Sequence, residues 1–294
     1  MNLPSDCTYK ILVLSGGGSH GAYQLGVLKC LIQKGKSWDA IAGVSVGALN
    51  GTYLAMHNKE EISKGVAKLE NIWLGIRGTF DVVKPWMPSA LNYPMAYFKG
   101  SFGSSAPLFR LIQSEFDLQS LQGSNVELKI GAVALGSGLY RTVDKMEPEF
   151  AKWVLASAAI PLLMPPVEIE GEKWIDGGLR NQTPLVSIFD LVMQESSKGK
   201  RVEVDVVLTG PVDSAVLSED PKKITSLLGV ALRTAEIAMD EIYLSELHKL
   251  QEAHVMTIYE PDSPLPVDSM SFNPDSIRLM LRLGYEETLK KVSV

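Results

Sequence analysis

The pattern of apolar and polar positions predicts short buried strands that alternate with helices. Residues 9–14 are almost wholly apolar, as in a strand buried on both faces, and Leu25, Leu28 and Ile32 then mark one face of a helix. Residues 39–44 form a second apolar run, and residues 46–57 continue as its helix. A βαβα unit at the start of the chain implies a parallel sheet with right-handed crossovers.

The rest of the chain extends this α/β pattern without an internal repeat, linker or low-complexity tract. The expected strands are 126–135, its antiparallel neighbour 138–144, the hairpin 167–175, 202–208 and 255–259. The expected helices are 59–74, 149–157, 184–194, a long amphipathic helix at about 221–251, and a terminal helix from Pro274 to about Lys291 with Asn273 as its N-cap. We therefore expect one domain over residues 1–294.

Residues 72–103 depart from this regular pattern. They contain a concentration of aromatic residues and three prolines that interrupt long elements: Trp73, Phe80, Trp86, Tyr93, Tyr97, Phe98 and Phe102, with Pro85, Pro88 and Pro94. One interpretation is a segment of loops and short helices that covers the core. The other is an aromatic-rich cap or lid, at about residues 72–107, that engages lipid.

Composition excludes several classes of protein. The chain has 294 residues, of which 46% are hydrophobic and 21% charged, so it is neither disordered nor short of core residues. A net charge of −6 gives no case for nucleic-acid binding. Cys7 and Cys30 form neither a metal-ligand spacing nor a disulfide framework, and we expect both to be reduced. Residues 1–6 lack the layout of a signal peptide, and no apolar run is long enough to span a membrane, so we expect a cytoplasmic protein.

The sequence Gly43-Val44-Ser45-Val46-Gly47 reads G-x-S-x-G, the pattern of a sharp strand-to-helix turn that exposes a serine. Only hydrogen at Gly43 and Gly47 lets the strand and the helix approach closely. A serine in this position sits at a helix N-terminus, where unpaired N–H groups favour developing negative charge. Ser45 is therefore a candidate nucleophile.

Two other functions compete for these motifs. Gly16, Gly18 and Gly21 also spell the dinucleotide fingerprint G-x-G-x-x-G. That interpretation requires an acidic residue at the end of the second strand, but Asp39 precedes that strand and Ser45 follows it. The order Ser45…Asp176…His248 or His254 matches an α/β-hydrolase triad. In that fold several strands precede the serine, whereas one does here, and both histidines lie in ordinary charged helical surroundings.

The chain resembles the patatin-like phospholipases in four blocks. Residues 15–21, residues 43–47 and Asp176-Gly177-Gly178 look like that family's three signature blocks, in their order and spacing. Residues 156–161, followed by Met164-Pro165-Pro166, are similar to a fourth block that precedes the aspartate. The resemblance covers residues 15–178 and implies a three-layer α/β/α fold with a mainly parallel central sheet.

The resemblance also implies a function and a site. It implies hydrolysis of lipid acyl esters by a dyad of Ser45 and Asp176, without histidine. The sequence contains no metal-ligand cluster, so we expect neither a metal nor a cofactor. Gly16, Gly17 and Gly18 would form the oxyanion hole, supported by the motif glycines Gly43, Gly47, Gly177 and Gly178. The expected partner is a lipid or other acyl-ester substrate, with peripheral membrane contact and no nucleic acid; the oligomeric state is left open. The alternatives are a non-catalytic relative that binds lipid or a partner, which the intact dyad disfavours, and the dinucleotide oxidoreductase.

One position departs from the family pattern. The family usually has arginine or lysine where this chain has His20, beside the glycine-rich loop. Histidine is mostly neutral at pH 7, so this position puts in doubt a preference for anionic headgroups rather than the reaction itself. His20 is our candidate substrate contact.

Overall fold

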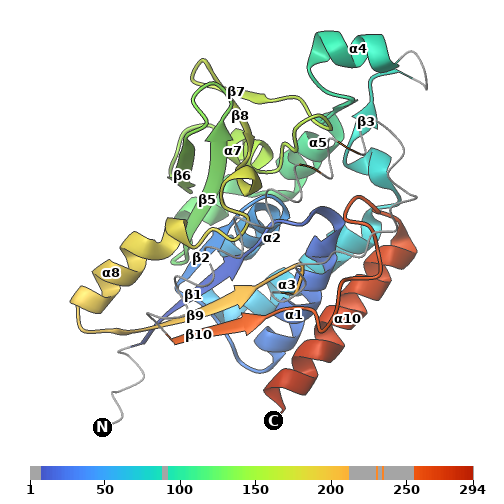
Figure 1. Ribbon diagram of the computed structural model, residues 1–294. Coiled ribbons are helices and arrows are strands. Elements are labelled where there is room, and N and C mark those ends of the chain that lie inside the picture. Colours follow the sequence, from blue (N-terminus) through green and yellow to red (C-terminus); the bar gives the residue numbers. More distant parts are fainter. Residues whose placement is uncertain (1–7, 88–91, 212–229, 231–233, 235–254, 294) are drawn as a thin grey trace.

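A mainly parallel sheet forms the centre of the molecule (Figure 1). The computed structural model describes residues 8–87, 92–211, 230, 234 and 255–293. Within these residues the main sheet has the strand order β10-β9-β1-β2-β5-β8-β7, and β6 also pairs with β5. Its strands are β1 Thr8–Leu14, β2 Ala40–Gly43, β5 Glu127–Ala134, β6 Tyr140–Asp144, β7 Val167–Ile169, β8 Glu172–Asp176, β9 Arg201–Val207 and β10 Val255–Tyr259. The pairs from β10 to β5 are parallel, whereas β6, β7 and β8 pair antiparallel.

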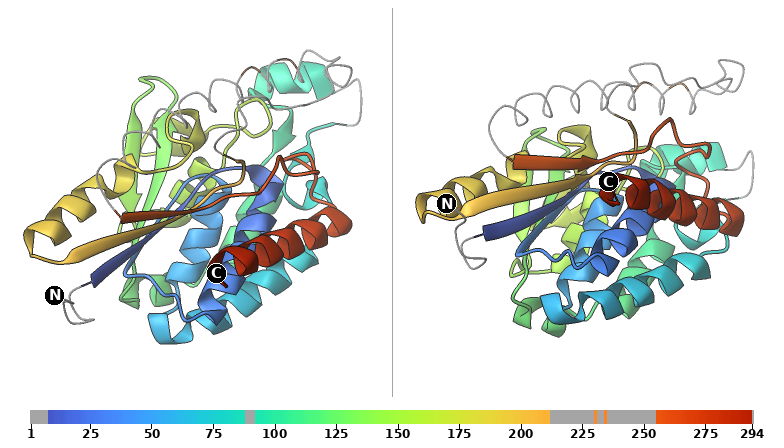
Figure 2. Two further views of the ribbon diagram at one scale, coloured as in Figure 1. Left: turned by 60° about the horizontal axis from the view of Figure 1, so that its bottom comes forward. Right: turned by 90° about the horizontal axis from the view of Figure 1, so that it is seen from below.

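Helices cover both faces of this sheet. The described helices are α1 Gly21–Gln33, α2 Val46–Ala55, α3 Ile62–Gly75, α4 Asn92–Lys99, α5 Ala106–Glu115, α6 Leu118–Gly123, α7 Phe150–Ser157, α8 Phe189–Ser197 and α10 Pro274–Val292. Leu12 and Leu14 of β1 face a core shared with α1, α2, α3 and α10, whereas Ile11 and Val13 face a second core that includes Leu191 of α8. Figure 2 shows α1 and α10 packed side by side beneath the sheet. The three-layer α/β/α fold class is confirmed.

The strand register brings the loops that carry the sequence motifs to one edge of the sheet. Leu14 pairs with Gly43 and with Val207, so β1, β2 and β9 end at the same level. The chain segments that leave these three strands carry the glycine-rich loop, Ser45 and Thr209. Carboxyl ends of parallel strands are where α/β folds gather functional groups.

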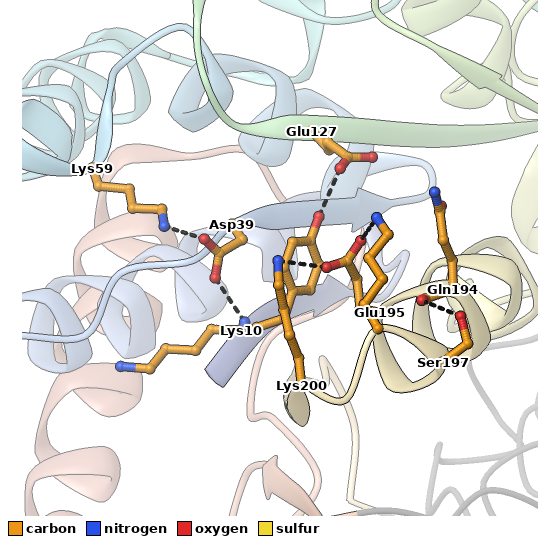
Figure 3. A network of polar contacts seen from close by, with 10 residues as sticks. Lys10, Asp39, Lys59, Glu127, Gln194, Glu195, Ser197 and Lys200 are labelled. Atoms are coloured by element: carbon orange, nitrogen blue, oxygen red, sulfur yellow. Dashed lines mark hydrogen bonds and ion pairs between the residues drawn. The ribbon is translucent and has the colours of Figure 1, made fainter. Parts of the chain in front are cut away.

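Charged and polar side chains form a network at the opposite edge of the sheet, where the parallel strands begin (Figure 3). The Tyr9 hydroxyl donates a 2.8 Å hydrogen bond to the carboxylate of Glu127. The buried carboxylate of Glu195 in α8 forms an ion pair with Lys200 at 2.7 Å. Asp39 belongs to this network, since it binds the backbone amide of Lys10 and the ammonium group of Lys59. The carboxylate that the dinucleotide interpretation needs is therefore at the far end of β1 from the glycine-rich loop, which argues against that interpretation.

Most predicted elements are observed, with two corrections. The segment expected to be a helix at 184–194 begins with tight i→i−3 turns, in which the amides of Ser187 and Ile188 donate to the carbonyls of Pro184 and Leu185. The α-helix itself is α8, Phe189–Ser197. Trp73, expected in the aromatic cap, is a core residue of α3 with 5% exposure. Apart from residues 230 and 234, the amphipathic helix expected at 221–251 lies outside the described residues, as do His248, His254 and Cys7. Cys30 is a free, buried thiol, as expected.

Residues 76–87 and 92–105 form short elements above α3 and α5, including the paired strands β3 Lys84–Pro85 and β4 Gly103–Ser104. The base of this segment is fixed: the amides of Phe102 and Gly103 donate to the carbonyls of Leu162 and Leu163, and the Trp86 indole donates to Ser101. Its outer part is exposed, with Tyr97 at 85% and Phe98 at 82%. Figure 1 shows α4, which carries both rings, at the end of the molecule farthest from α8.

Candidate active site

Ser45 lies on a strained turn between β2 and α2. Its φ of 54° and ψ of −127° lie in a region that L-residues with side chains seldom adopt. A Cβ on Gly43 would collide with the carbonyl of Gly47, and one on Gly47 would collide with the carbonyl of Leu14. The two motif glycines therefore let the start of α2 press against the ends of β1 and β2, which fixes Ser45 at the top of the sheet.

Asp176 reaches Ser45 through the register of β5. Gly43 of β2 is level with Ile130, and two residues farther along β5, Ala132 is level with Asp176 of β8. The end of β8 is therefore level with a position two residues beyond Gly43, which is Ser45. The Ser45 hydroxyl donates a 2.7 Å hydrogen bond to Oδ2 of Asp176.

The environment of Asp176 makes its carboxylate more basic. The side chain is 5% exposed, and this burial raises its pKa to about 7, although hydrogen bonds from Ser45 and from the amide of Gly178 oppose the rise. Gly178 donates to the other oxygen, Oδ1, at 2.7 Å. A Cβ on Gly177 would collide with the carbonyl of Gly131, so the Asp-Gly-Gly sequence permits this tight turn. A carboxylate with a pKa near 7 can exchange a proton with a hydroxyl at neutral pH.

The block at 156–161 supports both residues of this pair. Ser157, at the end of α7, accepts a 3.1 Å hydrogen bond from the amide of Ser45. The carbonyl of Ala159 accepts one of 3.0 Å from the amide of Asp176. The sequence marked this block only by its resemblance, and the role of Ser157 was not predicted.

The glycine-rich loop lies beside Ser45, but its three glycines are not equivalent. The amide of Gly16 donates 2.9 Å to the carbonyl of Gln182, so Gly16 is not available for the predicted oxyanion hole. Gly17 and Gly18 have φ angles of 146° and 57°, and no acceptor for their amides is found among the described residues. Consecutive amides in such conformations form a concave anion-binding site.

His20 occupies a different place from the one expected of a substrate contact. Its Nε2 lies 2.6 Å from the carbonyl of Val267. Because a carbonyl only accepts, Nε2 carries the hydrogen, and burial lowers the pKa of this imidazole. Ser19 makes two further bonds to the same segment, from its amide to Ser269 and from its hydroxyl to Asp268. His20 and Ser19 together hold residues 267–269 against the glycine-rich loop.

A chain of buried polar side chains supports the loop from below. Trp73 donates to Asn50, Asn50 donates to Gln24, and Gln24 donates 2.7 Å to the carbonyl of Ser15. These residues were missed in the sequence. The available signal was an amide side chain among mostly apolar or small neighbours, as at Gln24 in α1 and Asn50 in α2.

An apolar cavity opens beside Ser45. Ser45 and Gly18 form part of its wall, and the remaining wall comes mostly from apolar residues of α2, α3 and α5, with Met270 and Phe272. It encloses about 780 Å³ of empty space, counting the part open to solvent. The described residues contain no group of three or more His, Cys, Asp or Glu arranged to hold a metal ion. In the same part of the chain, no helix is both long and apolar enough to cross a bilayer.

Comparison with known proteins identifies the family. The family model for patatin-like phospholipases matches residues 12–188, which include the glycine-rich loop, Ser45 and Asp176. The chain belongs to the patatin-like phospholipase family. The expected family is thereby confirmed.

Several proteins are similar to this chain over part of their length. A lysophospholipase, nte1 of Aspergillus terreus, is 28% identical over 173 residues, which is 57% of this chain and 10% of that protein. The chain thus spans about a tenth of such curated fungal relatives. "Probable lipid hydrolase 463L" of invertebrate iridescent virus 6 is 24% identical over 217 residues, covering 68% of this chain and 69% of that protein.

Among solved structures, VipD from Legionella pneumophila has a TM-score of 0.47 at 17% identity and covers 97% of this chain and 67% of that chain. ExoU, a type III effector protein, has a TM-score of 0.43 at 12% identity and covers 98% of this chain and 53% of that chain.

Proposed function

We propose that this patatin-like protein is a lipid acyl hydrolase, a serine esterase with a catalytic dyad of Ser45 and Asp176. The observation that carries the proposal is the 2.7 Å hydrogen bond from the hydroxyl of a serine on a strained turn to a buried carboxylate, at the wall of an apolar cavity. Nucleophilic catalysis needs this contact between nucleophile and base.

The proposed reaction proceeds through an acyl-enzyme. Asp176 accepts the hydroxyl proton as Ser45 Oγ attacks the ester carbonyl carbon and forms a tetrahedral intermediate. The intermediate collapses, the bond to the leaving alcohol breaks, and Asp176 returns the proton to that alcohol. Water then gives a proton to Asp176 and attacks the acyl carbonyl carbon. The bond from that carbon to Ser45 Oγ breaks, Asp176 returns the proton to Oγ, and the carboxylic acid leaves.

The amides of Gly17 and Gly18 are the proposed oxyanion hole. Their hydrogens are not used by other described groups, and Gly18 shares the cavity wall with Ser45. Donors fixed before the reaction stabilise the developing negative charge without reorganisation. The bond from Gly16 to Gln182, together with the Gln24 contact to Ser15, would hold this loop in place.

The proposed substrates are lipids with apolar acyl chains. The wall beside Ser45 is almost entirely apolar, which suits an acyl chain rather than a polar substituent. The names of two relatives, a lysophospholipase and a lipid hydrolase, agree with this class of substrate. Access to such substrates would come through peripheral membrane contact by the exposed rings Tyr97 and Phe98 of α4.

The proposal is tested with short-chain p-nitrophenyl esters. Ser45→Ala and Asp176→Asn each abolish hydrolysis, and the double variant is little worse than either single one, because the two residues act as a unit. Activity survives excess EDTA. His248→Ala and His254→Ala serve as matched controls and retain activity. Loss of activity in either folded histidine variant would replace the dyad with a histidine triad.

A further inference from the structure

The apolar cavity runs lengthwise along three helices. On α2 and α5 the lining positions recur at i, i+3, i+4 and i+7, beginning at Val46 and Leu108, and on α3 they recur at i, i+3 and i+4 from Leu69. Ile76, which directly follows α3, also lines the cavity. This spacing places the lining residues of each helix in one strip along its axis. Three such strips enclose an elongated space that begins at Ser45.

The length of this space follows from helix geometry. Tyr53 follows Ser45 by eight residues along α2, and at 1.5 Å per residue the two are about 12 Å apart along the axis. An extended chain advances about 1.2 Å per bond, since three backbone bonds span roughly 3.6 Å. About ten carbons of an extended acyl chain therefore fit between Ser45 and Tyr53.

A second hollow, here called the outer hollow, adjoins the far part of the cavity. The two share five lining residues: Tyr53, Ile72, Ile76, Leu111 and Glu115. The outer hollow is also lined by the exposed charged residues Lys68, Arg77 and Asp81. The apolar wall thus gives way to a charged, solvated one about where the tenth carbon would lie.

We propose that the apolar cavity is an open-ended acyl channel, which recognises about the first ten carbons of an acyl chain and lets longer tails pass into the outer hollow. This proposal rests on the proposed function, because Ser45 sets the position of the acyl carbonyl. The far opening receives tails and does not release product: the carboxylate forms at Ser45, and moving a charge through an apolar channel is costly.

Binding of free fatty acids tests the channel without requiring turnover. Saturated acids of 4 to 16 carbons, kept below their micelle concentrations, compete with a fluorescent fatty acid for the wild-type protein. Affinity increases about three- to fourfold per methylene up to about ten carbons, the equivalent of about 0.8 kcal/mol each, and is then constant. A steady increase to 16 carbons, or a sharp fall beyond ten, would overturn the open-ended channel.

Variants at the junction of the two hollows provide the second test. Leu111→Trp narrows the junction, whereas Gln113→Trp places the same ring on an exposed position of α5 that lines neither hollow. Leu111→Trp lowers affinity for the 14-carbon acid at least tenfold relative to the 8-carbon acid, and Gln113→Trp keeps the wild-type profile. Equal profiles in the two variants contradict the channel.

A milder variant covers the case in which Leu111→Trp does not fold. Glu115→Leu makes the junction more apolar, so the increase in affinity continues to about 12 carbons; an unchanged plateau counts against the channel.

The two proposals fail in different ways. A protein that hydrolyses no ester but shows the ten-carbon plateau contradicts only the proposed function, whereas hydrolysis without the plateau contradicts only the channel.

Discussion

At the scale of single residues, burial of Asp176 gives the site a defined pH dependence. The carboxylate must be ionised to accept the Ser45 proton, and burial raises its pKa to about 7. We therefore expect kcat/KM to fall about tenfold per pH unit below 7 and to be constant above it. The measurement is hydrolysis of a soluble ester from pH 5 to 9. A rate that stays constant down to pH 5 would contradict the role of Asp176 as the base.

The same pKa shift has a consequence for stability. The ordinary pKa is 3.8 and the folded-state value is higher, so the contribution of this group is fully present below pH 3.8 and is lost as the pH rises through about 7. Asp176→Asn, which stays neutral, should therefore melt at a higher temperature than the wild type at pH 8, and the difference should shrink as the pH falls towards 4. Thermal unfolding over this pH range measures both effects.

Gly17 tests the oxyanion hole, and Gly35 provides its matched control. Both have a positive φ, but a Cβ on Gly17 meets Thr209, whereas one on Gly35 meets nothing within 4 Å. Gly17→Ala should lower kcat about 10²–10³-fold by misplacing an N–H donor. Gly35→Ala also places a side chain at a positive φ, but outside the site, and should leave kcat unchanged. A loss under about threefold in Gly17→Ala would reject the role of this amide.

The sequence predicted these residues unevenly, for physical reasons. Ser45 and Asp176 were predictable because their turns need glycine at fixed neighbouring positions. The occupied amide of Gly16 and the contact of His20 were not, because their partners, Gln182 and Val267, are distant in the sequence and are backbone carbonyls. Any residue type can supply a carbonyl, so no pattern of side chains marks these contacts.

At the scale of elements, α4 offers the clearest test of lipid engagement. Its rings Tyr97 and Phe98 are among the most exposed large side chains and contact each other edge to face. Tyr97→Ser with Phe98→Ser should reduce activity on phospholipid vesicles about tenfold or more, with soluble ester hydrolysis and melting temperature nearly unchanged, since the rings add apolar area only at a lipid surface.

Trp73 is the matched control for this prediction. Its ring is buried and its indole donates to Asn50 at 3.0 Å. Trp73→Phe should lower the melting temperature and both activities together, because it removes a buried hydrogen bond. If the α4 variant behaves in this way, the rings belong to the core and the lid interpretation fails.

The strands and helices themselves were largely predictable. The almost wholly apolar run at residues 9–14 matches β1, whose last four residues are all buried, and the alternation at the start of β5 matches a strand end that is buried on one face. Asn273 caps α10 as expected, with its side chain accepting from the amide of Ser276. The start of α8 was less predictable, because residues after a proline can form either tight turns or an α-helix.

At the scale of the whole molecule, the central feature is the meeting of two distant parts of the chain. Ser45 follows β2, which pairs parallel with β5, and Asp176 is the last residue of β8, which pairs antiparallel with the other side of β5. The register of these two pairings brings Ser45 and Asp176 to the same level. Sequence order does not specify that register; the resemblance to the patatin-like family anticipated the pairing, and the sheet accounts for it. The cavity likewise depends on three helices from separate segments.

The most direct test of the account is covalent labelling by an active-site-directed fluorophosphonate. Its phosphorus reacts with an activated serine hydroxyl and mimics the tetrahedral intermediate. The account predicts one labelled peptide, modified at Ser45, with labelling abolished in Asp176→Asn and slowed below pH 7. Stoichiometric labelling at another residue, or labelling of Ser45 that is unchanged in Asp176→Asn, would contradict it.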